Sequence, residues 1–128
     1  MSWKILIIED NEQNLYMMKF LFQKNGFDII SATRGIEGIE KALQYKPDGI
    51  LLDIQLPEMN GYEVAKKIKQ YEILADIPII AVTSYAMVGD REMILKAGAD
   101  GYIEKPIDTD SFVHDIKSYL QQKQVVKP

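Results

Sequence analysis

The stretch that decides the fold reads Gly49-Ile50-Leu51-Leu52-Asp53, a continuous apolar run that ends in a carboxylate. A run without alternating polar residues is typical of a strand in a parallel sheet that helices cover on both faces. A charged side chain at the end of a buried segment costs free energy unless some role requires it there. The stretch therefore predicts a central β-strand and makes Asp53 the strongest single candidate for a functional residue.

Four further short apolar segments flank this run, at residues 5–8, 28–32, 79–82 and 101–103. Their lengths and compositions predict strands. The segments at 5–8 and 79–82 are continuous like the first, whereas those at 28–32 and 101–103 are weaker. We therefore expect the two weaker strands at the edges of the sheet.

Amphipathic helical patterns separate the predicted strands. The first is expected to end at Asn25-Gly26, the second to span 35–45, the third to start after Asn60-Gly61, the fourth to span 90–97, and the fifth to start near Asp108 as its N-cap. The inward faces are expected to carry Leu15, Met18, Leu21 and Phe22; Ile36, Ile39, Ala42 and Leu43; Val64, Ala65 and Ile68; and Phe112, Val113, Ile116 and Leu120.

Strands that alternate with helices predict an α/β domain. We expect a flavodoxin-like (βα)5 fold, with a doubly wound parallel sheet of five strands in the order 2-1-3-4-5 and right-handed crossovers. Ligands of such sheets bind at the carboxyl ends of the strands. The residues that follow each strand are therefore the candidates for a functional site.

The length, hydrophobic content and net charge of the chain permit one domain and argue against nucleic-acid binding. With 128 residues, of which 47% are hydrophobic, the chain can bury one core. We expect one domain at residues 1–122 and a frayed tail at 123–128. A net charge of -4 argues against a nucleic-acid-binding surface, which requires a basic stripe.

The chain contains no cysteine, which excludes disulfides, zinc-thiolate sites and thiol chemistry. The apolar run at 5–8 is followed at once by Glu9 and Asp10, so it cannot form a signal-peptide core or a membrane span. We expect a soluble, cytoplasmic protein with no membrane partner.

Charged and hydroxyl residues follow four of the predicted strands. Glu9 and Asp10 follow the first, Asp53 ends the third, Thr83 follows the fourth, and Lys105 follows the fifth. Carboxylates that lie close together raise each other's pKa and need a compensating cation. Lys105 supplies one positive charge, and a metal ion could supply the rest.

The available ligands are hard oxygens, which favour magnesium, or alternatively manganese, over zinc or copper. Such an ion leaves one oxygen of Asp53 free to attack phosphorus and form an aspartyl phosphate. The metal, Lys105 and the Thr83 hydroxyl would stabilise the transition state electrostatically.

Taken singly, each residue has an ordinary structural explanation: Asp10 as a helix cap, Thr83 as a strand residue and Lys105 as a surface lysine. Together these explanations become improbable.

This combination resembles the receiver domains of two-component response regulators over essentially the whole chain, from Lys4 to Leu120. The segment at 53–61, Asp-Ile-Gln-Leu-Pro-Glu-Met-Asn-Gly, looks like the phosphorylation-site segment of that family. Within the family, residues 8–12 and 83–87 look most like a stand-alone regulator of bacterial cell division, and receivers of hybrid kinases share them. Ser84 departs from the alanine commonly found at its position.

The resemblance implies that Asp53 is the phosphoryl acceptor. It also implies that Asp10, Asp53 and the backbone carbonyl of Gln55 bind magnesium, with Glu9 binding through water. The chain would then be a phosphorylation-dependent signalling switch rather than an enzyme, with slow autodephosphorylation at most.

The resemblance also implies roles for residues near the ends of the last two strands. The Thr83 hydroxyl would turn toward the phosphoryl group, Tyr102 would swing inward as an aromatic switch, and Lys105 would contact a phosphoryl oxygen. Pro106 would follow a cis peptide bond. The implied partners are a histidine kinase or histidine phosphotransfer protein, and a downstream protein that binds the face of the last two strands and helices. We expect a monomer or a weak dimer.

Two residues are expected to tune the lifetime of the phosphoryl group. Gln55 and Tyr85, each two positions past a site residue, flank the expected path of attacking water. The bulk of Tyr85 should slow hydrolysis.

Rival interpretations are a receiver domain cut from a larger hybrid kinase or regulator, a small metal-dependent phosphatase, and a flavodoxin-like nucleotide or flavin binder. The phosphatase would need a general acid and a substrate-sequestering cap, and the chain shows neither insert. A nucleotide or flavin binder would need a Gly- or Ser/Thr-rich first loop, but this loop starts at Glu9 and Asp10 and would repel a bare phosphate.

Overall fold

The computed structural model describes residues 3–84 and 89–126. Its elements in chain order are β1 (Lys4–Ile8), α1 (Glu12–Lys24), β2 (Asp28–Ala32), α2 (Gly35–Tyr45), β3 (Gly49–Asp53), α3 (Gly61–Gln70), the 3-10 turn η1 (Glu72–Leu74), β4 (Ile79–Thr83), α4 (Asp90–Lys96), β5 (Gly101–Glu104) and α5 (Phe112–Val126). The strands form one parallel sheet in the order β2-β1-β3-β4-β5. The predicted α/β fold and strand order are confirmed, and the two weaker strands lie at the edges.

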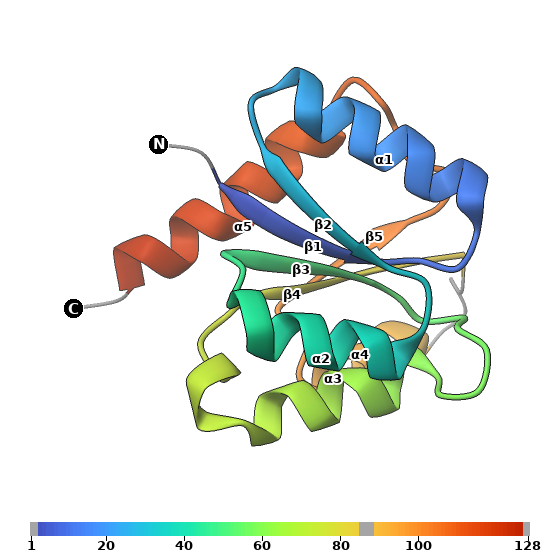
Figure 1. Cartoon of the computed structure of the whole chain (residues 1–128), viewed down its shortest axis with the longest axis vertical. Coiled ribbons are helices and arrows are strands. Elements are labelled where there is room, and N and C mark those ends of the chain that lie inside the picture. The colour runs from blue at the N-terminus through green and yellow to red at the C-terminus, as the bar shows by residue number, and fades with distance from the viewer. Residues whose placement is uncertain (1–2, 85–88, 127–128) are drawn as a thin grey trace.

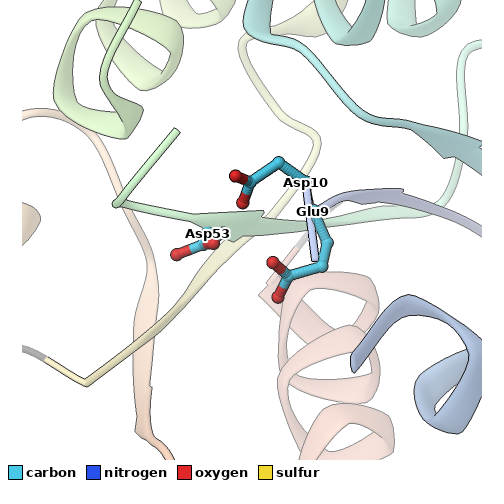
Figure 2. A group of neighbouring side chains, drawn as sticks. All are labelled: Glu9, Asp10 and Asp53. Carbon is cyan, nitrogen blue, oxygen red and sulfur yellow. The ribbon is translucent and has the colours of Figure 1, made fainter. Parts of the chain in front are cut away.

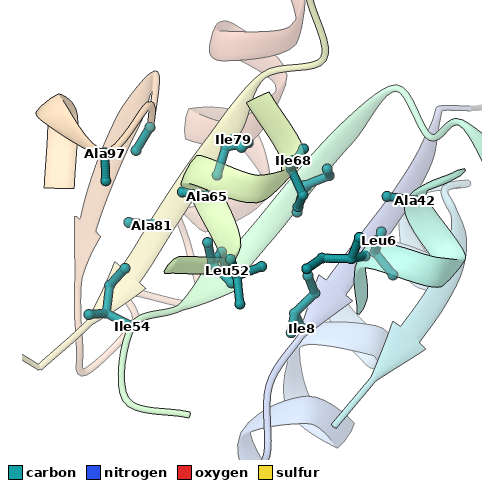
Figure 3. Close-up of a cluster of buried hydrophobic side chains, with 14 of the residues drawn as sticks. Leu6, Ile8, Ala42, Leu52, Ile54, Ala65, Ile68, Ile79, Ala81 and Ala97 are labelled. Carbon is teal, nitrogen blue, oxygen red and sulfur yellow. The ribbon is translucent and has the colours of Figure 1, made fainter. Parts of the chain in front are cut away.

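Helices cover both faces of the sheet (Figure 1). On one face α1 and α5 pack over a core that includes Phe22, Leu51 and Phe112. On the other face α2, α3 and α4 pack over a second core, drawn in Figure 3, that includes Leu6 and Leu52. Because successive side chains of a strand point to opposite faces, the apolar run of β3 contributes to both cores. No helix among the described residues is long and apolar enough to cross a membrane.

Helix ends follow the chemistry of their capping residues. The Asn11 side chain accepts a hydrogen bond from the Asn14 N–H at 2.9 Å, which starts α1 beside the carboxyl end of β1. Asn60 starts α3 in the same way. At the end of α1 the chain turns through Gly26 at φ +83°, the left-handed conformation that glycine adopts without strain. The predicted stop at Asn25-Gly26 is confirmed.

Three expectations about the helices differ from the structure. The side chain of Ile36 was expected inward but is 55% exposed, because it lies at the start of α2 and beyond the edge of the core. The last helix begins at Phe112 rather than near Asp108, because the Asp108 carbonyl accepts hydrogen bonds from the N–H groups of Ser111 and Phe112 in a preceding turn. That helix continues to Val126, past the boundary expected at residue 122.

A half-buried lysine connects three segments at the amino-terminal end of β4. The Lys69 ammonium donates hydrogen bonds to the carbonyls of Ala75 and Ile77 and to the carboxylate of Asp100, at 3.0–3.2 Å. The same Asp100 oxygen accepts the Ile79 N–H at 2.9 Å. We call this arrangement the Lys69 clasp. It joins α3 to the segments that precede β4 and β5, at the end of the sheet opposite the candidate site.

Replacing Gly61 with alanine is expected to lower the free energy of unfolding by about 1–3 kcal/mol, the usual cost of overpacking. A Cβ atom at Gly61 would lie 2.5 Å from the Ile54 Cα and 2.7 Å from the Asp53 carbonyl oxygen, and backbone atoms cannot move aside cheaply. Urea denaturation measures the change. Gly38→Ala is the control for a clash with a side chain instead of backbone, because the three atoms nearest to its Cβ would all belong to the Ile8 side chain. Equal costs for both variants would contradict this explanation.

Candidate functional site

The carboxyl ends of β1, β3, β4 and β5 bring the predicted site residues to one edge of the sheet. Glu9 and Asp10 follow β1, and Asp53 is the last residue of the neighbouring strand β3. Thr83 is the last residue of β4, and Lys105 directly follows β5. The sheet order, rather than closeness in sequence, therefore assembles the site.

Three carboxylates form an acidic cluster at this edge, which consists of Glu9, Asp10 and Asp53. One carboxylate oxygen from each lies within 4.8 Å of the others, and Figure 2 shows the three groups turned toward a common space. The Glu9 side chain is 1% exposed and Asp53 is 4% exposed, whereas Asp10 is open to solvent. The acidic cluster is therefore closed on the protein side and accessible from the side of Asp10.

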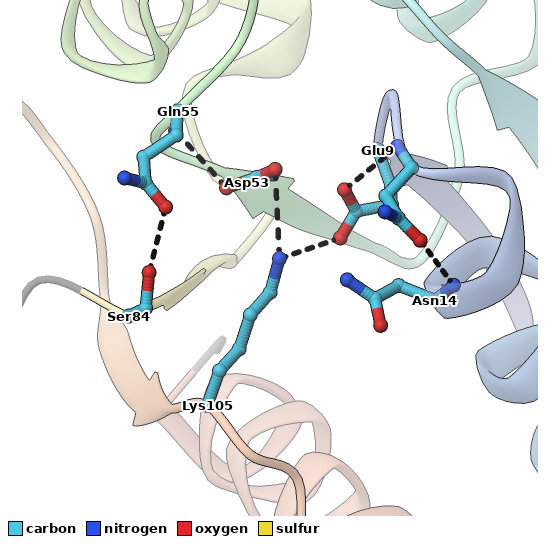
Figure 4. A network of polar contacts seen from close by, with 7 residues as sticks. Glu9, Asn14, Asp53, Gln55, Ser84 and Lys105 are labelled. Atoms are coloured by element: carbon cyan, nitrogen blue, oxygen red, sulfur yellow. Dashed lines mark hydrogen bonds and ion pairs between the residues drawn. The ribbon is translucent and has the colours of Figure 1, made fainter.

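Lys105 places its ammonium group between the two buried carboxylates (Figure 4). Its Nζ lies 2.9 Å from Glu9 Oε1 and 3.5 Å from Asp53 Oδ2. The Lys105 N–H donates to the Thr83 carbonyl at 2.9 Å, which fixes the lysine backbone against β4. The peptide bond between Lys105 and Pro106 is cis, as predicted. One positive charge thus serves two buried negative charges.

The surroundings of Glu9, a buried carboxyl group that shares one cation with Asp53, shift its pKa. Burial raises that pKa to about 7, and the neighbouring Asp53 raises it as well, while the hydrogen bonds from Lys105 and from the Asn11 N–H act in the opposite direction. Near neutral pH the Glu9 carboxyl group therefore holds part of a proton that an isolated glutamate would have lost. A second cation at the site would displace that proton.

The donor set fits a hard divalent cation. All of the clustered ligands are carboxylate oxygens, and the cluster carries more negative charge than Lys105 compensates. The backbone of Gln55, another predicted ligand, lies beside the cluster, because its N–H donates to Asp53 Oδ1 at 3.0 Å. The site can therefore hold such an ion next to Asp53.

Magnesium affinity is expected to rise about tenfold between pH 6 and pH 8, because the bound proton must leave Glu9 before the ion binds fully. Below its raised pKa the Glu9 carboxyl group is neutral, and the ion must compete with a proton. Above this pKa the group is already ionised, so magnesium affinity rises with pH. Titration calorimetry at several pH values measures the effect. The Glu9→Gln variant should bind more weakly and lose this dependence, and a flat wild-type profile would contradict the assignment.

The sequence matches a known family on the residues that build this site. Residues 5–117 match the response regulator receiver domain family. The chain belongs to this family. Receiver domains are the response-regulator modules of two-component signalling.

Among relatives of this receiver domain is the polar-differentiation response regulator DivK of Brucella ovis. It is 45% identical over 120 residues, which cover 94% of this chain and 98% of that protein. The receiver domain of a sensor histidine kinase from Pseudomonas aeruginosa, with a magnesium ion coordinated in its active-site cleft, is 30% identical with a TM-score of 0.87, covering 94% of this chain and 99% of that one. A CheY-like receiver domain protein from Methanospirillum hungatei is 29% identical with a TM-score of 0.91, covering 99% and 100%.

The remaining predicted residues of the receiver domain lie on β4, on β5 and in the loops. Thr83 is fully buried at the end of β4. Tyr102 lies on β5, paired with Ala81, and packs against the core beneath α2, α3 and α4. Partial burial raises the pKa of Tyr102, and the nearby Glu104 carboxylate raises it further. Tyr85 lies outside the described residues.

One contact at the site was not predicted from the sequence. The Ser84 hydroxyl donates a hydrogen bond to Gln55 Oε1 at 2.7 Å and so joins the loop after β4 to the loop after β3 (Figure 4). The sequence marked Ser84 only as a departure from the alanine common in the family. The sequence feature that could have predicted this contact is a hydroxyl residue next to Thr83, at the end of the strand that neighbours the strand of Asp53.

Proposed function

We propose that Asp53 accepts a phosphoryl group from a histidine kinase or a histidine phosphotransfer protein, and that the resulting phosphoaspartate changes the binding of partner proteins. The observation that carries this proposal is the environment of Asp53. Its carboxylate is 4% exposed, one oxygen accepts the Gln55 N–H, and the other faces Lys105 inside the acidic cluster. Burying a carboxylate against two others is costly without such a role.

Magnesium is the proposed cofactor, and manganese would satisfy the same ligands. Asp10, Asp53 and the Gln55 carbonyl would bind the ion directly, and Glu9 would bind it through water. When bound, the ion supplies positive charge to the phosphoryl oxygens. The support in this chain is the oxygen-only donor set and the surplus of negative charge over Lys105.

The phosphoryl transfer forms one bond and breaks one. A free oxygen of Asp53 attacks phosphorus, the bond from phosphorus to the donor histidine nitrogen breaks, and that nitrogen keeps the electron pair and takes a proton from solvent. The Lys105 ammonium lies 3.5 Å from Asp53 Oδ2, close enough to reach a phosphoryl oxygen after a small shift away from Glu9. The Thr83 hydroxyl would stabilise the same group.

The output is a change in the surface formed by β4, α4, β5 and α5. The phosphoryl group adds charge and acceptor oxygens, Thr83 turns toward it, and Tyr102 moves inward. Gln55 and Tyr85 tune the rate at which water removes the phosphoryl group. The switch operates in the cytoplasm as a monomer or weak dimer, and its partners are proteins rather than nucleic acids or membranes.

The likeness to DivK, over 98% of that protein, supports a role as a stand-alone regulator of polar differentiation. The alternative is a receiver domain of a larger hybrid kinase, which the likeness to the receiver of a Pseudomonas aeruginosa sensor kinase supports. Both alternatives use the same chemistry at Asp53.

The test is the intact mass of the protein after incubation with acetyl phosphate, with and without magnesium. We expect one added phosphoryl group per chain, and only when magnesium is present. Folded protein that gains no phosphoryl group under either condition contradicts the proposal.

A further inference from the structure

Gln55 is held beside Asp53 by one hydrogen bond of its backbone and one of its side chain. Its backbone N–H donates to Asp53 Oδ1 at 3.0 Å, and its carboxamide oxygen accepts the Ser84 hydroxyl at 2.7 Å. Figure 4 shows the carboxamide directed toward Ser84. Because β3 and β4 are neighbours, with Asp53 paired to Val82, this contact spans the two loops that border the acceptor. We call it the Ser84–Gln55 latch.

The latch turns the carboxamide oxygen, the group that can direct water, toward Ser84. A glutamine next to a phosphoryl group can orient the water that attacks it, because the carboxamide oxygen accepts a hydrogen bond from that water. In this structure the oxygen of Gln55 already accepts a hydrogen bond from Ser84. Both side chains are exposed, and among the described residues the bond to Ser84 is the one that holds the carboxamide in this orientation against competing water.

We propose that Ser84 is a positioning residue that withholds the Gln55 carboxamide from attacking water and so lengthens the lifetime of the phosphoryl group on Asp53. The inference rests on the proposed function, since it requires Asp53 to be phosphorylated. In the hydrolysis that the latch slows, a water oxygen bonds to phosphorus and the bond between phosphorus and the Asp53 oxygen breaks. The carboxylate keeps the electron pair, and a proton of the water passes to solvent.

The experiment compares four proteins: wild type, Ser84→Ala, Gln55→Met and the double variant. Each is phosphorylated with acetyl phosphate, separated from the donor, and followed by intact mass as the phosphoryl group is lost. Ser84→Ala should lose it about fivefold faster, the change expected when a hydrogen bond of typical net strength is removed. The double variant should match Gln55→Met, because Ser84 acts only through Gln55.

Two further readouts separate positioning from a general effect on structure. Ser84→Thr keeps the hydroxyl and should restore the slow rate. The side-chain amide signal of Gln55 in a nitrogen-15 NMR spectrum should shift in Ser84→Ala and return toward its wild-type position in Ser84→Thr. Thermal unfolding of each variant verifies that the fold is intact.

Two results would overturn the latch while leaving the acceptor assignment in place. Ser84→Ala could lose the phosphoryl group at the wild-type rate, or it could accelerate the loss equally with glutamine and with methionine at position 55. The second result would mean that the size of residue 84 controls access of water. A wild-type protein that forms no adduct would overturn the proposed function together with this inference.

Discussion

Asparagine in place of Asp53 is expected to abolish the phosphoryl adduct that wild-type protein forms with acetyl phosphate and magnesium. A carboxamide has nearly the shape of the carboxylate but lacks its nucleophilic oxygen. The neighbouring carboxylates are poor substitutes. Glu9 is buried and bonded to Lys105 at 2.9 Å, and Asp10 lies on the exposed side of the cluster. Intact mass after incubation measures the loss, and circular dichroism verifies the fold.

Asp10→Asn is the matched control for this variant. It removes one carboxylate from the same cluster but keeps the proposed nucleophile. We expect it to slow adduct formation at low magnesium and to regain much of the rate at high magnesium. An adduct that persists in Asp53→Asn and vanishes in Asp10→Asn would assign the phosphoryl group to Asp10 and refute our assignment.

Methionine in place of Lys105 is expected to lower the free energy of unfolding by about 3 kcal/mol at pH 8, the scale of loss when one partner of a buried ion pair is removed. The substitution leaves Glu9 and Asp53 buried without their shared cation. The long apolar side chain keeps most of the packing, so the loss reports mainly on charge. Urea denaturation measures it.

The loss should shrink as the pH falls. Loss of Lys105 removes a contact that lowers the pKa of Glu9, so in the variant this pKa rises above the value of about 7 in wild type, and between the two values only the folded variant holds the proton. Each pH unit over which the folded variant holds one more proton than folded wild type recovers about 1.4 kcal/mol of the loss. Lys96→Met, at an exposed lysine, serves as the control and should change little. A loss in Lys105→Met that does not depend on pH would contradict the role of charge.

The sequence predicted the sheet well because burial on both faces leaves an unambiguous pattern. The runs that end at Ile8, Asp53 and Thr83 are apolar at nearly every position, and these strands lie in the centre. Because ligands of parallel sheets bind at the carboxyl ends of the strands, Glu9 and Lys105 could be predicted to lie in one site, although 96 positions separate them in the chain.

The orientation of individual side chains was less predictable, because it depends on contacts with residues that are distant in the sequence. Ile36 fits the apolar period of α2 but lies beyond the edge of the core. Asp108 has the chemistry of an N-cap, yet its carbonyl closes a turn before α5 begins. The bond between Ser84 and Gln55 depends on the spacing of two loops, which no local pattern records.

The Lys69 clasp gives the molecule a mechanical asymmetry. Its ammonium and the Asp100 carboxylate tie α3 to the starts of β4 and β5, so that end of the sheet is held independently of the acidic cluster. The Ser84–Gln55 latch at the opposite end is a single exposed hydrogen bond. β4 itself stays paired with β3 and β5 along its length, so the strand does not pivot. Lys105 is the corresponding tie at the carboxyl end, and because it contacts Asp53, a chemical change at Asp53 alters this tie and leaves the Lys69 clasp untouched.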